Sequence, residues 1–197
     1  MSMQPTAGEL IADGFAMGGE RLVALDLVDT ELLAVDPPVD LIGTPEQLAR
    51  WWALQQVRLP AGPVPDGTAV RRLRTAVREL LGSHLEGREP SATSVDDVNA
   101  AAAGAPQSLR LAATTDGLRV ATRWHPEYGG NAALAMIARE TIELMADAAG
   151  LSRLRRCANP NCSMLFLAEH KRRQWCVGSV CGNRTRVARH YEKTRRS

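Results

Sequence analysis

Apolar residues recur at intervals of three and four through much of the first 150 residues, which is the spacing of one face of an α-helix. Segment 20–33 is apolar at most positions and predicts a mostly buried helix that ends before Pro37-Pro38. Segment 68–85 repeats Val and Leu at the same spacing and predicts an amphipathic helix. The arginines outside its apolar face are expected to face solvent: Arg71, Arg72, Arg74 and Arg78.

Capping residues indicate where further helices begin and end. Thr44-Pro45-Glu46-Gln47 combines an N-cap threonine, a proline at the first helical position and the glutamine of a capping box. Ser94, followed by an acid three residues later, predicts the start of a short Ala-rich helix. Asn131 predicts the start of another helix, which Gly150 ends. We place a boundary at this glycine, giving domains of residues 1–150 and 151–197.

Strict alternation of apolar and polar residues occurs in two neighbouring segments, 109–113 and 118–124. They flank the turn-forming dipeptide Asp116-Gly117, so together they predict a β-hairpin. Because the hairpin is amphipathic, we expect it to share a core with the helices. The predicted fold is mainly α (α+β): a helical N-terminal domain with one β-hairpin, followed by a small C-terminal domain.

All four cysteines lie in the C-terminal domain, as two C-x4-C pairs separated by thirteen residues. Two short loops that each aim a pair of thiolates at one point can form a tetrahedral zinc site. Four sulfurs leave no open position for water or substrate, so the metal should be structural. The predicted cofactor is Zn²⁺, and the predicted ligands are Cys157, Cys162, Cys176 and Cys181.

Three alternatives compete with this site. Two disulfides fit the count, but the chain shows no secretory signal, which predicts a cytoplasmic protein with reduced thiols. An Fe–S cluster also uses four thiolates, although the familiar ferredoxin spacings differ. His170 lies between the pairs and could replace a cysteine, but its charged neighbours favour an exposed loop tip.

Charge divides the chain at the same place. Residues 151–197 contain twelve Lys or Arg and two acids, a net charge of +10, whereas residues 1–150 carry a net charge of −8. A basic domain attracts polyanions, and a helix predicted over 179–193 presents part of this charge, although a solvated basic face is the simpler interpretation. The predicted DNA-contacting residues are Arg172, Arg173, Arg184, Arg186, Arg189, Lys193, Arg195 and Arg196.

Polar and aromatic residues of the large domain could line a cavity for a small-molecule effector. The simpler interpretation is an exposed helix edge for the two acids and core packing for the tryptophans. The candidate pocket residues are Asp26, Asp29, Trp51, Trp52 and Trp124.

The tetrad Cys181-Gly182-Asn183-Arg184, the strand segment 165–167 and the approach 172–176 resemble the CGNR zinc-finger proteins. These are bacterial stress-induced transcription regulators with an N-terminal ABATE-like domain, and segment 25–30 is similar to its L-D-F-V-N-T motif. Met164, Leu27 and Asp29 depart from the family pattern. The resemblance implies DNA binding by the finger and a regulatory role for the larger domain.

The sequence therefore predicts a zinc-dependent, double-stranded-DNA-binding transcription regulator. An RNA-binding protein or a protein-interaction adaptor that uses the same finger is the alternative. An enzyme is not expected, because no Ser-His-Asp or Cys-His arrangement, phosphate loop or open metal site is evident.

No apolar run reaches the roughly 18 residues of a membrane span. A homodimer is a further hypothesis, since two-fold oligomers are common and match palindromic DNA sites.

Overall fold

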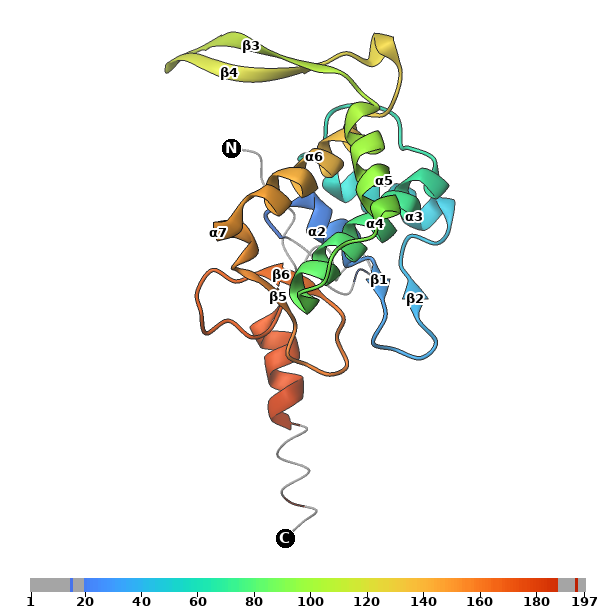
Figure 1. Ribbon diagram of the computed structural model, residues 1–197, viewed down its shortest axis with the longest axis vertical. Coiled ribbons are helices and arrows are strands. Elements are labelled where there is room, and N and C mark those ends of the chain that lie inside the picture. The colour runs from blue at the N-terminus through green and yellow to red at the C-terminus, as the bar shows by residue number, and fades with distance from the viewer. Residues whose placement is uncertain (1–14, 16–19, 188–193, 195–197) are drawn as a thin grey trace.

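A computed structural model describes residue 15, residues 20–187 and residue 194 of the chain. The large domain is mainly helical and α4 lies at its centre, in contact with α2, α5 and α6 (Figure 1). Its helices are α2 (Val23–Val28), α3 (Pro45–Gln55), α4 (Gly67–Glu86), α5 (Ala92–Ala103), α6 (Ala132–Ala146) and α7 (Ala148–Leu151). A 3₁₀ turn, η1, covers Pro126–Tyr128.

The described strands form three separate two-stranded antiparallel sheets. They are β1 (Glu31–Leu32) with β2 (Val39–Asp40), β3 (Gln107–Thr114) with β4 (Gly117–Trp124), and β5 (Leu154–Arg156) with β6 (Leu165–Leu167). The chain continues into a π-helical turn, η2 (Gly178–Gly182), and α-helical residues 183–187. The predicted mainly helical fold with a hairpin is confirmed.

The capping box of α3 is present as predicted. The Gln47 backbone N–H donates to Thr44 Oγ1 at 3.3 Å, and the Thr44 N–H donates to Gln47 Oε1 at 3.0 Å. Two other helix boundaries were predicted wrongly. Ser91 caps α5, three residues before the predicted Ser94, and α6 ends at Ala146, so Gly150 lies inside the short α7.

Helix α2 is also shorter than predicted, because the chain turns into β1 at Glu31. The Arg78 guanidinium donates to the carbonyl oxygens of Val28 and Glu31, at 2.9 Å for Glu31. These carbonyls thus obtain partners outside a helix, so the helix can end without losing hydrogen bonds. Arg78 lies about 50 residues from these carbonyls, so the apolar pattern of segment 20–33 contains no information about this contact.

The α4 arginines do not all face solvent as expected. Arg74 is 3% exposed and forms a bidentate ion pair with Asp40, with Nη1–Oδ1 and Nη2–Oδ2 distances of 2.6 and 2.9 Å. The same guanidinium donates to Thr30 Oγ1 at 3.0 Å. Arg74 therefore joins α4 to the β1–β2 region, because a buried charge is tolerated only with such partners.

The predicted hairpin forms but does not join the core. Strands β3 and β4 pair over eight residues each, and their large apolar side chains are exposed. Figure 1 shows the hairpin projecting from the top of the helical domain. The expectation of a shared core is wrong, because alternation shows that two faces differ without showing what covers the apolar one.

The C-terminal strands, in contrast, are part of the main core. Leu154, Leu165 and Leu167 pack in the same buried cluster as the helices of the large domain. Phe166 points to the other side, into a second cluster that also contains Met164 and three of the cysteines, Cys157, Cys176 and Cys181. Strand β6 therefore lies between the helical core and the cysteines.

Candidate metal centre

The four cysteine sulfurs lie within 4.8 Å of one another. Cys176 Sγ is 3.7 Å from Cys162 Sγ and 3.6 Å from Cys181 Sγ. Sulfurs bound at about 2.3 Å to one tetrahedral zinc ion would be separated by about 3.8 Å. A disulfide needs a sulfur–sulfur distance of about 2.05 Å, and all four cysteines are free. The arrangement is a metal-binding cluster.

Local structure brings each pair of cysteines together. Cys157 follows β5 and Cys162 precedes β6, so the first pair lies in the loop of a β-hairpin, closed by Cys157 N–H donating to Met164 O at 3.0 Å. Cys176 precedes η2 and Cys181 lies within it. The Ala158 N–H donates to Gln174 O at 2.9 Å and holds the two pairs side by side.

Electrostatics within the cluster favour a cation. The pKa of Cys157 is lowered because Cys162 and Cys176 donate hydrogen bonds to its thiolate, and the Asn159 N–H also donates to it. The pKa values of Cys162 and Cys176 are raised because their protons are held by Cys157. Four thiolates cannot coexist this closely without positive charge, and a divalent ion supplies it.

His170 lies outside this cluster. Its side chain is exposed, and the group of metal-ligating atoms in the described part of the chain consists of the four cysteines. The alternative in which His170 replaces a cysteine therefore has no support in the geometry.

The predicted DNA-contacting residues fall into three groups. Arg172, Arg184 and Arg186 are exposed, and the latter two lie on the helix that follows Cys181. Arg186 also donates to the side chain of Asn183. Four predicted residues lie outside the described residues: Arg189, Lys193, Arg195 and Arg196.

Arg173 forms the third group, because its contacts lie inside the protein. Its guanidinium donates to Cys176 O at 2.6 Å and to Leu167 O at 3.2 Å. It also pairs with Glu20 at 3.1 Å and lies over the Phe166 ring, 4.5 Å from its centroid. Arg173 thus connects the loop before the second cysteine pair to β6 and to the large domain.

Asp29 makes a second connection between the domains. Its carboxylate accepts a hydrogen bond from the Leu165 backbone N–H at 2.9 Å, although the two residues are 136 positions apart. Asp29 is 3% exposed, and burial raises its pKa well above the usual value. The sequence pattern suggested only an exposed edge or a pocket wall for this residue. The sequence did contain one sign of this contact, because an acidic residue within a mostly apolar helical segment needs a buried hydrogen-bond donor.

Asp26 is buried as well, one turn before Asp29. It pairs with Arg58 at 2.6 Å and accepts from Gln55 Nε2 at 3.3 Å. Burial raises its pKa, and the Arg58 charge opposes that shift. The exposed-edge interpretation is therefore wrong for both acids, because each has a buried partner from a distant element.

The tryptophans of the candidate pocket lie in two places. Trp51 and Trp52 are in the main core, with ring centroids 5.7 Å apart. Trp124 lies at the base of the β3–β4 hairpin, with the Arg139 guanidinium 4.9 Å from its ring centroid. Asp26 therefore lies close to α3, which carries Trp51, whereas Trp124 lies beside Arg139 of α6.

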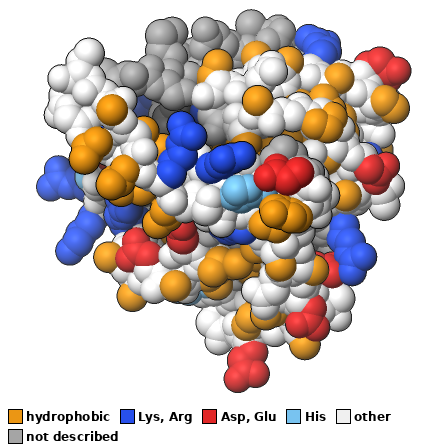
Figure 2. All heavy atoms as spheres, turned by 90° about the horizontal axis from the view of Figure 1, so that it is seen from above, with side chains coloured by type: hydrophobic (Ala, Val, Ile, Leu, Met, Phe, Trp, Pro, Cys, Tyr) orange, Lys and Arg blue, Asp and Glu red, His pale blue; other side chains and the backbone are white. Residues whose placement is uncertain are grey.

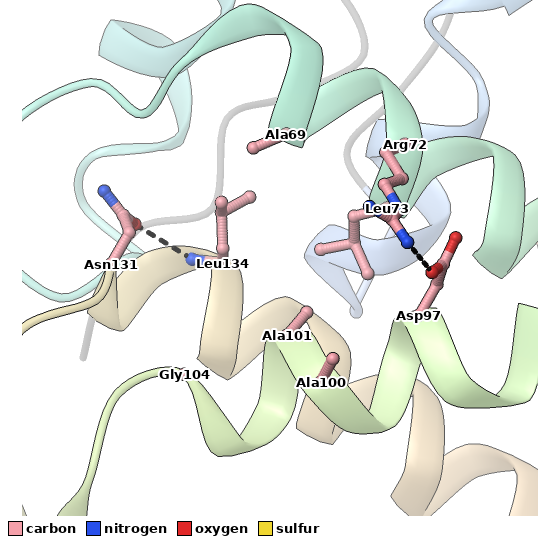
Figure 3. A pocket seen from close by; sticks show the side chains of 9 residues that line it. All are labelled: Ala69, Arg72, Leu73, Asp97, Ala100, Ala101, Gly104, Asn131 and Leu134. Carbon is pink, nitrogen blue, oxygen red and sulfur yellow. Dashed lines mark hydrogen bonds and ion pairs between the residues drawn. The ribbon is translucent and has the colours of Figure 1, made fainter.

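Three cavities in the described part of the chain are lined by residues other than these five candidates. The one in Figure 3 has a volume of about 250 Å³ between α4, α5 and the start of α6. Its polar groups already have partners, since Arg72 pairs with Asp97 and the Asn131 oxygen accepts from Leu134 N–H at 3.0 Å. We assign no ligand to it.

The fold and the cluster define a class of protein: a helical domain joined to a C-terminal four-cysteine, metal-binding finger. The ABATE family, described as "Putative stress-induced transcription regulator", matches residues 22–148. The CGNR zinc finger matches residues 153–194. The chain belongs to the ABATE family and carries a CGNR zinc finger, as the sequence motifs predicted. A comparison with curated proteins finds no match.

These families are regulatory and zinc-binding, and neither description names an enzymatic reaction. Among the described helices, each is too short or too polar to cross a membrane.

Proposed function

We propose that this protein is a zinc-dependent transcription regulator that binds double-stranded DNA through its C-terminal finger. Cys157, Cys162, Cys176 and Cys181 would hold the zinc ion. When bound, zinc supplies the positive charge that stabilises four thiolates and cross-links the β5–β6 hairpin to η2. Because the cluster requires reduced thiols, the proposal places the protein in the cytoplasm.

The observation that carries the proposal is the position of a basic helix on the cluster. Cys181 fixes the start of this helix, and its next turn presents Arg184 and Arg186 to solvent. Arginines held by a rigid element can contact successive phosphates or a guanine edge in a groove. The large domain carries a net charge of −8, so DNA should approach from the finger side.

The large domain would regulate the finger through their shared interface. Asp29 of the family-like segment 25–30 holds β6, and β6 packs against the cysteine cluster. A partner or effector that shifts α2 would therefore act directly on the strand beneath the metal. A small-molecule effector stays a prediction, because the five candidate residues do not line the three cavities described above.

Removing two exposed arginines tests the DNA-binding proposal. The R184S/R186S variant should bind duplex DNA more weakly and show a shallower salt dependence, by roughly 0.9 log unit for each phosphate that is no longer neutralised. Fluorescence anisotropy with a pool of mixed-sequence duplexes at several salt concentrations measures both quantities. The zinc content should stay the same, because neither arginine is a ligand.

The matched control is R110S/R119S, which removes two exposed arginines from the β3–β4 hairpin. This variant should retain the affinity and the salt slope of the natural protein. Equal losses in both variants would indicate only a non-specific effect of charge. If single-stranded RNA binds as tightly as duplex DNA, or if R184S/R186S binds DNA normally, the RNA-binding or adaptor alternative is favoured.

A further inference from the structure

The β3–β4 hairpin has one apolar face and one basic face. Cross-strand partners lie on the same face of a sheet, and residues two apart along a strand also share a face. Leu111 is paired with Val120, and the neighbouring pairs on that face are Leu109 with Thr122 and Ala113 with Leu118. The opposite face carries the three arginines Arg110, Arg119 and Arg123.

The apolar face is almost fully exposed. Leu109 is 72% exposed, and Leu111, Leu118 and Val120 are each 70% exposed. Together these side chains form an apolar patch on the order of 400–500 Å², in the upper part of the range found on monomers. A two-stranded hairpin without a covered face is only marginally stable in water. Covering this face would therefore stabilise the hairpin.

The base of the hairpin is fixed to the helical domain. Arg139 lies over Trp124 and donates to the carbonyl oxygens of Ala102 at 2.9 Å and Ala105 at 3.1 Å. Gly130, with a φ of 79°, packs so closely on the end of α5 that a Cβ would lie 1.7 Å from Gly104 O. The hairpin is thus directed away from its own domain, which leaves its apolar face uncovered (Figure 1).

We propose that this face packs against the same face of a second copy of the chain. In a two-fold dimer the same patch of each subunit packs against the other, so an apolar face can pair with its own copy without complementary charges. The face carries no charged side chain, which leaves nothing to select a charged partner. Two hairpins stacked about 10 Å apart would enclose both apolar layers and leave the arginines in solvent.

The dimensions of the hairpin suit such an interface. Eight residues per strand at about 3.4 Å each give a face about 27 Å long. A standard interface buries about 800 Å² per partner. The exposed apolar side chains supply about half of this area, and the flanking side chains and backbone of so long a face can supply the remainder.

Figure 2 views the molecule from the hairpin end and shows hydrophobic and basic side chains lying next to one another on that side of the molecule.

The hairpin and the metal centre lie at opposite ends of the molecule (Figure 1). Pairing through the hairpins would leave both basic helices uncovered. This inference does not depend on DNA binding, and its test does not use DNA.

Sedimentation velocity of the full-length protein across a concentration series tests the proposal. The 21.3 kDa chain should sediment with twice this mass at concentrations on the order of 10 µM. The L111S/V120S variant, which replaces the central cross-strand pair, should raise the dissociation constant at least about 100-fold. The R110S/R119S variant makes the same kind of change on the opposite face and should remain dimeric.

Hydrogen exchange of the natural protein gives a second measurement, independent of any variant. Amides of residues 107–124 should exchange more slowly at high than at low protein concentration, and those of residues 178–187 should not change. A natural protein that stays monomeric at about 100 µM would overturn the proposal. So would a dimer that L111S/V120S leaves intact while both variants keep the helical circular dichroism of the natural protein.

Discussion

The β3–β4 and β5–β6 hairpins are both two-stranded antiparallel sheets, but their surroundings are opposite. The β3–β4 hairpin has eight-residue strands, clear alternation and an exposed apolar face. The β5–β6 hairpin has three-residue strands, yet every residue of β6 is buried between the helical core and the cysteines. Strong local patterning thus does not predict burial, and weak patterning does not exclude it.

The difference arises from what covers each hairpin. Strand β6 is held from two distant parts of the sequence: by Asp29 of the large domain, and by Arg173 and the cysteine cluster of the finger. The β3–β4 hairpin is held at its base by Arg139 and packs little on other described elements. The β5–β6 hairpin should therefore be essential for stability, and the β3–β4 hairpin should matter mainly for association.

Among the substitutions that test this difference between the hairpins, loss of a metal ligand should have the largest effect on stability. The Cys176→Ser variant should lose zinc and unfold the finger, since structural zinc contributes roughly 10–16 kcal/mol in finger peptides. Because Leu154, Leu165 and Leu167 belong to the main core, the large domain should also become less stable. Zinc content by mass spectrometry and urea unfolding followed by circular dichroism measure the two effects.

The Ser179→Ala variant, at an exposed position in the adjoining turn η2, is the control and should keep both zinc and stability. If Cys176→Ser released zinc without changing the urea midpoint of the large domain, the shared core would not be energetically important.

A matched pair of leucines compares the two hairpins directly. Leu165→Ala should cost about 2–5 kcal/mol of unfolding free energy, because it leaves a cavity in the core. Leu111→Ala should change the stability of the monomer by no more than about 0.5 kcal/mol, because its side chain is already in water. Urea unfolding at a concentration that keeps the protein monomeric gives both values. Equal costs would mean that the β3–β4 hairpin is packed on its own domain.

Asp29 gives a smaller and pH-dependent effect. Asp29→Ala should cost about 1–3 kcal/mol, because it leaves the buried Leu165 N–H without an acceptor. Asp29→Asn keeps an acceptor and removes a buried charge, so it should be more stable than the natural protein at neutral pH. Burial raises the pKa of Asp29 in the folded state, so the folded protein binds the proton more tightly than the unfolded chain.

The stability of the natural protein should therefore rise as the pH falls toward the unfolded pKa, and the advantage of Asp29→Asn should shrink in that direction. Urea midpoints between pH 8 and pH 5, measured with zinc content, test this dependence. Arg78, Glu20 and Asp26 share the electrostatic environment of Asp29 and are unchanged in both variants. A constant difference across this range would show that Asp29 carries the same charge in the folded and unfolded states.

The sequence alone determined the parts of this protein that depend on neighbouring residues. The C-x4-C spacing placed each pair of sulfurs in one short loop, the Thr44 capping box began α3, and alternation around Asp116-Gly117 formed a hairpin. Each of these features is formed by groups within a few residues of one another. The family motifs added the regulatory class, which the comparisons support.

Which charges are buried and which apolar faces are covered depends instead on contacts between residues far apart in the chain. Arg74 meets Asp40 from 34 residues away, and Asp29 meets the Leu165 amide from 136 residues away. A periodic pattern records that a helix or strand has two unlike faces, but the free energy of each face depends on the element packed against it. For the same reason, the sequence predicted the β3–β4 hairpin correctly and placed its apolar face wrongly in the core.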